Sequence, residues 1–530
     1  MSLATLSNIR GVRPALLFLA LLTIAVYGNS LVNGFVWDDE FIIVNDPAVR
    51  DLSGATTLML SPDVVKPYYR PLNRASYLLD YRLFGMRPAG FHAVNVVIHL
   101  LNVLLLYLLG LRFFRSAAPA VLAAALFAVH PINAEAVNFL SARNTLLSLF
   151  FVLSSILVFH QGLTRGSWGR LVVSGLLWFL GLLSKEPAAL AIVVMAAMAF
   201  ALPGRRENMP KPKIAVLLPH VVFAGAYAIL RVLAVGGAVG SSGFIPGLSG
   251  RLAGNVIVIP QYLWLVLFPS NLNIMHSLSA PAIGDMPWLI VVWGTIVIAV
   301  WLLLRTGSVP VRIGLFWFAL NYLPVSNIVP IPSTPMAERY LYLPAVGLWI
   351  IAADRGYAMY GKLHNSKALA AAAVAVVVLL GVVTVHRNRD WKSDMALFGS
   401  VVRTDPGSSF GHFNLGNSLR DAGDLEGAQR EWKETLRLDP ENSGAMTQLG
   451  SFAAVKGDLD KAERWFKAAL DADPANAMAR FNLALVFEKT GKPEEAAVQY
   501  DLFMRNVPLE YREYIPRAEE NRARLRKGFK

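Results

Sequence analysis

Residues 91–111, FHAVNVVIHLLNVLLLYLLGL, form one uninterrupted run without a single Lys, Arg, Asp or Glu. A helix of this length crosses the hydrocarbon core of a bilayer. The rest of the chain has the same character, because 55% of its 530 residues are hydrophobic and the mean hydropathy is +0.47. The sequence therefore predicts an all-α membrane protein with many spans, and it excludes an ordinary soluble enzyme.

Similar apolar runs lie on both sides of this one. Together they predict eleven membrane spans, at residues 14–27, 91–111, 118–138, 144–162, 170–184, 187–202, 214–235, 287–304, 313–330, 340–354 and 367–385. The run 14–27 has no convincing cleavage site after it, so we interpret it as an uncleaved first span. The run 252–268 contains Pro260, and the loop 269–286 that follows it has no Lys or Arg, so we interpret it as a re-entrant or interfacial piece on the outer side.

Charge divides the chain into two parts. Residues 1–386 contain 26 Lys and Arg but only 13 Asp and Glu, whereas residues 387–530 contain 23 of each. Basic residues concentrate in alternate loops of the first part, which marks these loops as cytoplasmic and is a poor match to nucleic-acid binding. The absence of cysteine excludes disulfides, thiolate catalysis and Cys-ligated zinc.

An acidic stretch follows the first span and opens a long outer loop, residues 35–90. It reads FVWDDEFII at residues 35–43 and places Asp38, Asp39 and Glu40 in a row. Adjacent acids at a membrane boundary repel one another and lose hydration, which is typical of a base or a cation ligand, although a solvated loop is the alternative. The aromatic and apolar residues of this loop predict amphipathic pieces on the membrane surface.

A sequence repeat of constant length begins after the last span. Residues 409–442, 443–476 and 477–510 superpose Gly423, Gly457 and Gly491, and they also superpose three aromatic residues, Trp432, Phe466 and Tyr500. This is the tetratricopeptide pattern of paired helices, and it predicts an α-solenoid that binds peptide or protein or serves as an assembly platform. We predict a leading half repeat at 391–408 and a solvating cap at 511–530, so the domains are 1–386 and 387–530.

Several short motifs then appear in one order. They are WDD at 37–39, YRPL at 69–72, GFHAVNVVIHL at 90–100, LFAVHPINAEAVNFLSAR at 126–143, LSKEPA at 183–188 and ERYLYLP at 338–344. Together with the repeats, they resemble the transmembrane and tetratricopeptide-repeat-containing O-mannosyltransferases, which are GT-C class membrane glycosyltransferases. The resemblance implies a GT-C-like membrane domain that transfers a mannose-like sugar from a polyprenyl-phosphate donor, on the outer or periplasmic side, to a hydroxyl of a protein or glycan.

This chemistry needs a base for the acceptor hydroxyl and cations for the departing phosphate. Matched onto the acidic pair of the family, Asp38 is the predicted base and Asp39 orients it, with the reverse assignment left open. The predicted donor-phosphate ligands are basic residues at outer helix ends: Arg70, Arg143, Lys185, Arg231 and Arg339. Each of them has the alternative of a snorkelling or salt-bridged residue. The supporting residues are Glu40, Tyr69, His92, His130, Glu135, Glu186 and Glu338.

The histidines of the apolar part do not form a convincing metal site. His130 and Glu135 are separated by Pro131, which breaks the helical spacing that would aim both side chains at one metal ion. We therefore predict no cofactor and no protein-held zinc, and leave open a divalent cation at Asp38 and Asp39. The competing function is a non-enzymatic membrane scaffold or a transporter of lipid-linked sugars. A transporter is expected to carry paired charges near the membrane midplane, whereas the charges here lie mostly at the ends of spans.

An odd number of spans predicts that the repeats lie on the same side of the membrane as Asp38. The basic stretch 386–392, HRNRDWK, argues for the cytoplasm instead. A reporter fused after residue 530 tests this: we expect activity from an export-dependent enzyme. Fluorescence from a protein that matures only in the cytoplasm would contradict both the span count and the outer placement.

Overall fold

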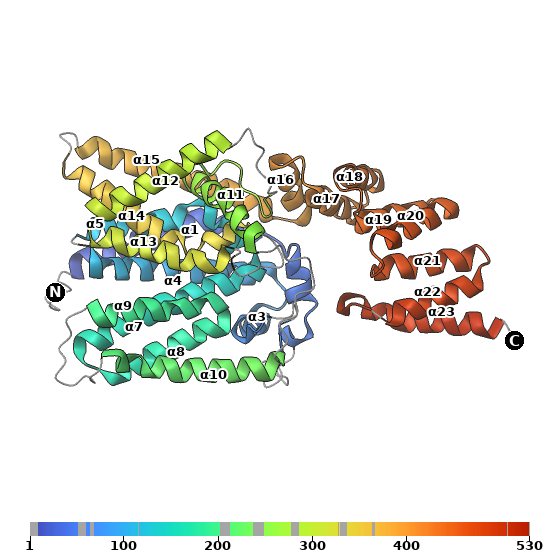
Figure 1. Cartoon of the computed structure of the whole chain (residues 1–530), viewed down its shortest axis with the longest axis horizontal. Helices are drawn as coiled ribbons and strands as arrows, with labels where there is room; N and C mark the ends of the chain where they lie inside the picture. The colour runs from blue at the N-terminus through green and yellow to red at the C-terminus, as the bar shows by residue number, and fades with distance from the viewer. Residues whose placement is uncertain are drawn as a thin grey trace. The chain divides into compact units, whose positions relative to one another are not determined.

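The computed structural model describes residues 9–50, 60–63, 68–114, 116–201, 213–236, 248–276, 286–326, 328, 336–362, 366–505 and 507–528. The chain divides into two compact units, Met1–Ser393 and Asp394–Lys530 (Figure 1). This division lies slightly after the boundary that the charge pattern predicts.

The first unit is built from apolar helices joined by short 3₁₀ turns. Its α-helices are α1 (Ile9–Tyr27), α3 (Pro71–Phe84), α4 (Pro88–Phe113), α5 (Ala117–Val129), α6 (Ala134–Asn138), α7 (Arg143–Arg165), α8 (Trp168–Ser184), α9 (Ala191–Ala201), α10 (Leu218–Val235), α11 (Leu248–Leu267), α12 (Met286–Thr306), α13 (Val309–Tyr322), α14 (Ala345–Tyr360) and α15 (Ser366–Arg387). Six of the described helices are long and apolar enough to cross a membrane, and a bent helix pair makes a seventh. This confirms a multi-pass membrane domain, whereas the count of eleven spans stays a prediction.

Helices α4, α5 and α7 form the centre of this unit. Helix α8 packs on α7, and α10 packs on α8, while α13, α14 and α15 gather on the side of α5 (Figure 1). Small residues allow the closest crossing. A Cβ atom on Gly347 of α14 would lie 2.2 Å from the carbonyl oxygen of Gly314 on α13, so only glycine permits this approach.

The predicted span 118–138 is bent at Pro131, where the sequence indicates a break in the helix. Helix α5 ends at Val129, and α6 continues after a bend of 53°. Pro131 has no N–H group to continue the helical hydrogen bonds, and the side chain of His130 instead accepts a hydrogen bond from the Ile132 N–H at 3.1 Å. The bend brings the buried Glu135 carboxyl group against the segment that carries Arg339.

The described residues of the outer loop include helix α3, whereas its position on the membrane surface stays a prediction. Tyr77 and Leu78 of this helix are buried, whereas Leu79 and Leu83 are exposed. The end of the last apolar helix returns to the start of the same loop, where the Asn33 Nδ2 atom donates to the Asn388 carbonyl oxygen at 3.0 Å. The C-terminal ends of α1 and α15 therefore lie at the same end of the helical unit.

The second unit confirms the tetratricopeptide solenoid. Its helices are α16 (Asp394–Thr404), α17 (Ser409–Asp421), α18 (Leu425–Leu438), α19 (Ser443–Val455), α20 (Leu459–Ala472), α21 (Ala477–Lys489), α22 (Pro493–Arg505) and α23 (Ile515–Gly528). Ser408, Asn442 and Asn476 occupy the same place in successive repeats, and each side chain caps the helix that follows it. The aromatic residue of every repeat is buried between paired helices.

Candidate active site

Asp39 is held inside the protein by three hydrogen bonds. Its Oδ1 atom accepts from the Ser141 N–H at 2.7 Å and from the Ser141 hydroxyl at 2.6 Å, and its Oδ2 atom accepts from the Val36 N–H at 3.2 Å. The side chain is fully buried. Burial raises the pKa of Asp39 to about 7, while the Ser141 and Val36 hydrogen bonds oppose this rise. This carboxyl group fixes the outer loop to the Ser141 turn.

Asp38 has a different environment, since it is only partly buried and faces Arg339. Burial raises the pKa of the Asp38 carboxyl, and the positive charge of Arg339 opposes the rise. The residue before it, Trp37, has a φ of +53° and is the single non-glycine residue with positive φ among those described. Its ring stacks on Phe139 at 5.3 Å, which holds the loop in this uncommon conformation.

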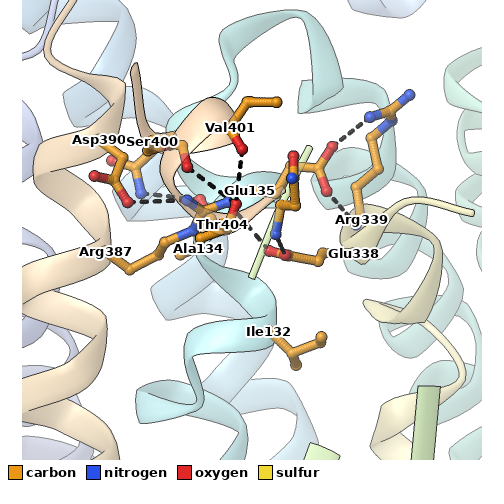
Figure 2. A network of polar contacts seen from close by, with 12 residues as sticks. Ile132, Ala134, Glu135, Glu338, Arg339, Arg387, Asp390, Ser400, Val401 and Thr404 are labelled. Carbon is orange, nitrogen blue, oxygen red and sulfur yellow. Dashed lines mark hydrogen bonds and ion pairs between the residues drawn. The ribbon is translucent and has the colours of Figure 1, made fainter. Parts of the chain in front are cut away.

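Arg339 comes from the ERYLYLP motif and is paired with the bent α5–α6 segment (Figure 2). Its guanidinium group donates to Glu135 Oε1, and its backbone N–H donates to Glu135 Oε2 at 2.8 Å. Because Glu135 is fully buried, its charge requires this partner. The pair therefore places a guanidinium group beside Asp38, with electrostatic contact between Arg339 and Asp38.

Three more of the predicted cations gather around Glu186. Arg70 donates to Glu186 Oε2 at 3.1 Å, and Arg231 lies 3.8 Å from Glu186 Oε1. Lys185 differs from both, because among the described residues it forms no ion pair, and its Nζ atom donates to the Thr145 hydroxyl at 2.7 Å. Burial and the charges of Arg70 and Arg339 lower the pKa of Lys185 to about 7. An anion beside Lys185 would favour its charged form.

Arg143, the fifth predicted cation, lies apart from this cluster in a fully buried position. Its guanidinium group donates to Asn95 at 2.6 Å and to the Phe91 carbonyl oxygen at 2.9 Å, and pairs with Asp80 at 2.5 Å. The ring of Tyr77 covers it at 4.7 Å. This geometry favours a structural role, in which Arg143 ties α3 and α4 to α7.

Both predicted supporting histidines make structural contacts. His92 lies within hydrogen-bond distance of the Gly34 carbonyl oxygen, at 3.2 Å, and thereby holds the start of the outer loop. His130 lies 3.0 Å from the Val266 carbonyl oxygen at the end of α11, and its other ring nitrogen caps the turn after α5. Both nitrogens of His130 are therefore in use within the protein.

The remaining supporting residues lie at different depths. Glu338 is fully buried and accepts from the Asn273 N–H, while Arg387 lies 3.7 Å from its other oxygen (Figure 2). Tyr69 is buried against Tyr227, with ring centres 6.0 Å apart. Glu40 is exposed, which agrees with a solvated neighbour of the acidic pair.

Sequence reasoning missed the neutral side chains that hold these charges. Ser141 binds Asp39, and Thr145 binds Lys185. Ser141 lies in the motif 126–143, and Thr145 lies two residues after it. The charged residue at this end of the motif is Arg143, which drew attention away from its neutral neighbours. A serine or threonine has no charge to single it out, so its role becomes visible only when its partner is located.

Comparison with protein families places known domains on both units. Residues 75–230 match the family described as dolichyl-phosphate-mannose-protein mannosyltransferase. Residues 413–477 and 466–503 match the tetratricopeptide repeat family. These matches confirm the predicted resemblance in the first unit and the repeat assignment in the second.

Curated relatives carry the same name in several animals. The chain is 27% identical over 451 residues to Protein O-mannosyl-transferase F38B6.6 of Caenorhabditis elegans, covering 80% of this chain and 62% of the relative. It is 27% identical over 477 residues to human Protein O-mannosyl-transferase TMTC1, covering 77% and 53%. The chain thus spans between about half and three fifths of the length of these relatives.

Two solved structures also show similarity. The crystal structure of the Archaeoglobus fulgidus oligosaccharyltransferase in the apo form matches with a TM-score of 0.37 and 14% identity, covering 74% of this chain and 56% of that one. The crystal structure of MamA protein matches with a TM-score of 0.22 and 24% identity, covering 26% of this chain and 76% of that one.

The buried Arg143–Asp80 pair predicts a stability effect. Arg143→Met leaves the Asp80 carboxylate without its partner, and we expect the free energy of unfolding to fall by about 3–5 kcal/mol. Thermal unfolding in detergent measures this, and Arg82→Met on the exposed side of α3 serves as the control. Unchanged stability of Arg143→Met together with a raised KM for the sugar donor would contradict the structural role and support Arg143 as a phosphate ligand.

Proposed function

We propose that the chain is an integral-membrane glycosyltransferase that moves a mannose-like sugar from a polyprenyl-phosphate donor to a hydroxyl of a protein acceptor. The observation that carries this proposal is the position of Asp38, a partly buried acid that faces Arg339, whose positive charge also acts on Lys185. The names of the matched family and of the curated relatives, which specify mannose and protein, support the choice of sugar and acceptor.

In this proposal Asp38 is the general base. It takes the proton of the acceptor hydroxyl while the hydroxyl oxygen forms a bond to C1 of the sugar and the bond from C1 to the phosphate oxygen breaks. A carboxylate whose pKa is raised by burial is a stronger base than one in water. Asp39 is unsuited to this step, because hydrogen bonds already occupy both of its oxygens.

Lys185 is the proposed main ligand of the departing phosphate. The charges of Arg70 and Arg231 are directed to Glu186, and that of Arg339 to Glu135, so these arginines are partly neutralised. Lys185 has only a neutral hydroxyl as its hydrogen-bond partner among the described residues. A phosphate beside it would supply the missing negative charge, with Arg339 and Arg70 contributing from either side.

The reaction is proposed to take place on the outer face of the membrane, where the repeats recruit the acceptor or a partner protein. The contact between Asn33 and Asn388 supports a common side for the Asp38 loop and the point where the repeats are attached. The proposed step assigns proton removal to Asp38 and charge stabilisation to Lys185 and Arg339, so it routes no chemistry through a metal ion.

Replacement of the base tests the chemistry. Asp38→Asn keeps the shape of the side chain but removes its basicity, and we expect kcat to fall by about 10²–10⁴-fold with little change in thermal stability. The assay follows transfer of radiolabelled mannose from a polyprenyl-phosphate donor to a serine- and threonine-containing peptide. The neighbouring exposed acid provides the control, since Glu40→Gln should retain the wild-type rate. A normal rate in a folded Asp38→Asn variant would refute the assignment.

The phosphate ligand is tested by the pH dependence of donor binding. Lys185 binds the phosphate when protonated, so the donor KM should stay constant below pH 7 and rise by about tenfold per pH unit above it. Lys185→Arg, whose side chain remains charged, should lose this rise. Lys185→Gln should show a high KM at every pH, whereas Lys362→Gln at an exposed turn is the control. A wild-type KM independent of pH would contradict the assignment.

A further inference from the structure

Two side chains of the turn that follows the last apolar helix, Asn388 and Trp391, are buried within the first unit. This turn, the 3₁₀ segment η12 (Asn388–Trp391), belongs to the basic stretch that the sequence presents as a charged membrane flank. The Asn388 side chain is fully buried. Its Nδ2 atom donates to the Val26 carbonyl oxygen and to Asn29 Oδ1, both at 2.9 Å, and its Oδ1 atom accepts from Asn138 Nδ2 at 2.7 Å. Asn388 therefore joins three segments that are distant in sequence.

Further hydrogen bonds extend this join to the acidic loop. The Asn33 Nδ2 atom donates to Asn138 Oδ1 and to the Asn388 carbonyl oxygen, each at 3.0 Å. One residue later, the Gly34 N–H donates to the Lys392 carbonyl oxygen at 3.1 Å. Buried amides that are paired in this way allow little displacement, because each movement would leave a polar group without a partner. The start of the Asp38 loop is thus fixed to the turn.

An aromatic stack provides a second connection. The Trp391 ring is fully buried and stacks on Phe139, with ring centres 5.5 Å apart and an angle of 28° between the planes. Phe139 in turn stacks on Trp37 at 5.3 Å and 12°. Trp37 has the positive φ noted above and immediately precedes Asp38. A backbone conformation that is unfavourable for a tryptophan needs such support from its surroundings.

The end of α15, which leads into this turn, contacts the cationic side of the site. Arg387, directly before the turn, lies 3.7 Å from Glu338 and pairs with Asp390 at 2.9 Å (Figure 2). Glu338 is the residue before Arg339. Arg387 and the turn together therefore contact the segment that presents the cation and the segment that presents the acid.

We infer that Asn388 and Trp391 are positioning residues of the transfer reaction, which hold Trp37 and thereby aim Asp38 at the acceptor hydroxyl. This inference rests on the proposed function and adds two residues to it that neither the motifs nor the family match contains. Neither residue acts on the substrate directly. Their effect reaches Asp38 through Phe139 and Trp37, and through the amide contacts of Asn33.

The experiment separates kcat from KM in the full chain. Trp391→Leu removes the stack and should lower kcat by about 10–100-fold, because a shift of about 1 Å in a catalytic group has this effect, while the donor KM changes less than about twofold. Trp391→Phe keeps an aromatic ring in the stack and should recover most of the rate. Asn388→Ala should reproduce the kcat loss. Trp432→Leu removes an equally buried indole from the repeats and should leave kcat for a short peptide unchanged.

A double-mutant cycle shows whether Trp391 acts through Trp37. If it does, Trp37→Leu combined with Trp391→Leu loses no more rate than the more damaging single variant. Additive losses would overturn the inference, and so would a lower melting temperature with a normal kcat in the folded fraction. Phe139→Leu breaks the same stack in its middle and decides the matter if Trp391→Leu does not fold.

Asp38→Asn, measured in parallel, distinguishes failure of the proposed function from failure of the positioning role. A wild-type chain that transfers no sugar, or an active Asp38→Asn variant, contradicts the proposed function. Loss of transfer in Asp38→Asn with a normal kcat in folded Trp391→Leu and Phe139→Leu contradicts only the positioning role.

Discussion

The pairing of Glu135 with Arg339 is the interaction on which the site depends. A carboxylate that is fully removed from water must meet a positive charge or several hydrogen-bond donors, and Arg339 supplies both a guanidinium group and a backbone N–H. This requirement fixes the turn at 338–341 against the bent α5–α6 segment. In this position the positive charge of Arg339 opposes the rise that burial causes in the pKa of Asp38, and it adds to the fall that burial causes in the pKa of Lys185.

Asp38 and Asp39 have the same side chain but differ in burial and in hydrogen bonding. Asp39 points into the protein and is saturated by Ser141 and Val36, whereas Asp38 remains partly accessible. Two adjacent carboxylates that both faced the site would repel each other and raise each other's pKa. Because Asp39 is buried and hydrogen-bonded within the protein, Asp38 is the acid of this pair that remains accessible.

The five predicted cations likewise differ in the partners that they bind. Arg143 satisfies its donors inside the protein, and Arg70, Arg231 and Arg339 share their charges with buried or half-buried carboxylates. Only their three-dimensional partners distinguish them, since all five look alike as basic residues at helix ends. Lys185 is distinguished by its neutral hydrogen-bond partner, since among the described residues its charge is paired with no carboxylate.

Local and periodic patterns determined much of this protein from the sequence alone. Uncharged runs predict membrane helices, and glycines and aromatics repeated at a constant interval predict the solenoid, because each of these signals acts within one helix or one repeat. The WDD stretch likewise identified the candidate acids of the site. Only the tertiary structure decided which charges are paired, since pairing joins residues as distant as Glu135 and Arg339. It also showed that Asn388 and Trp391, within the charged stretch 386–392, are buried against the start of the Asp38 loop, because the hydrogen bonds of Asn388 and the stacking of Trp391 exist only once α1, α6 and α15 have been brought together.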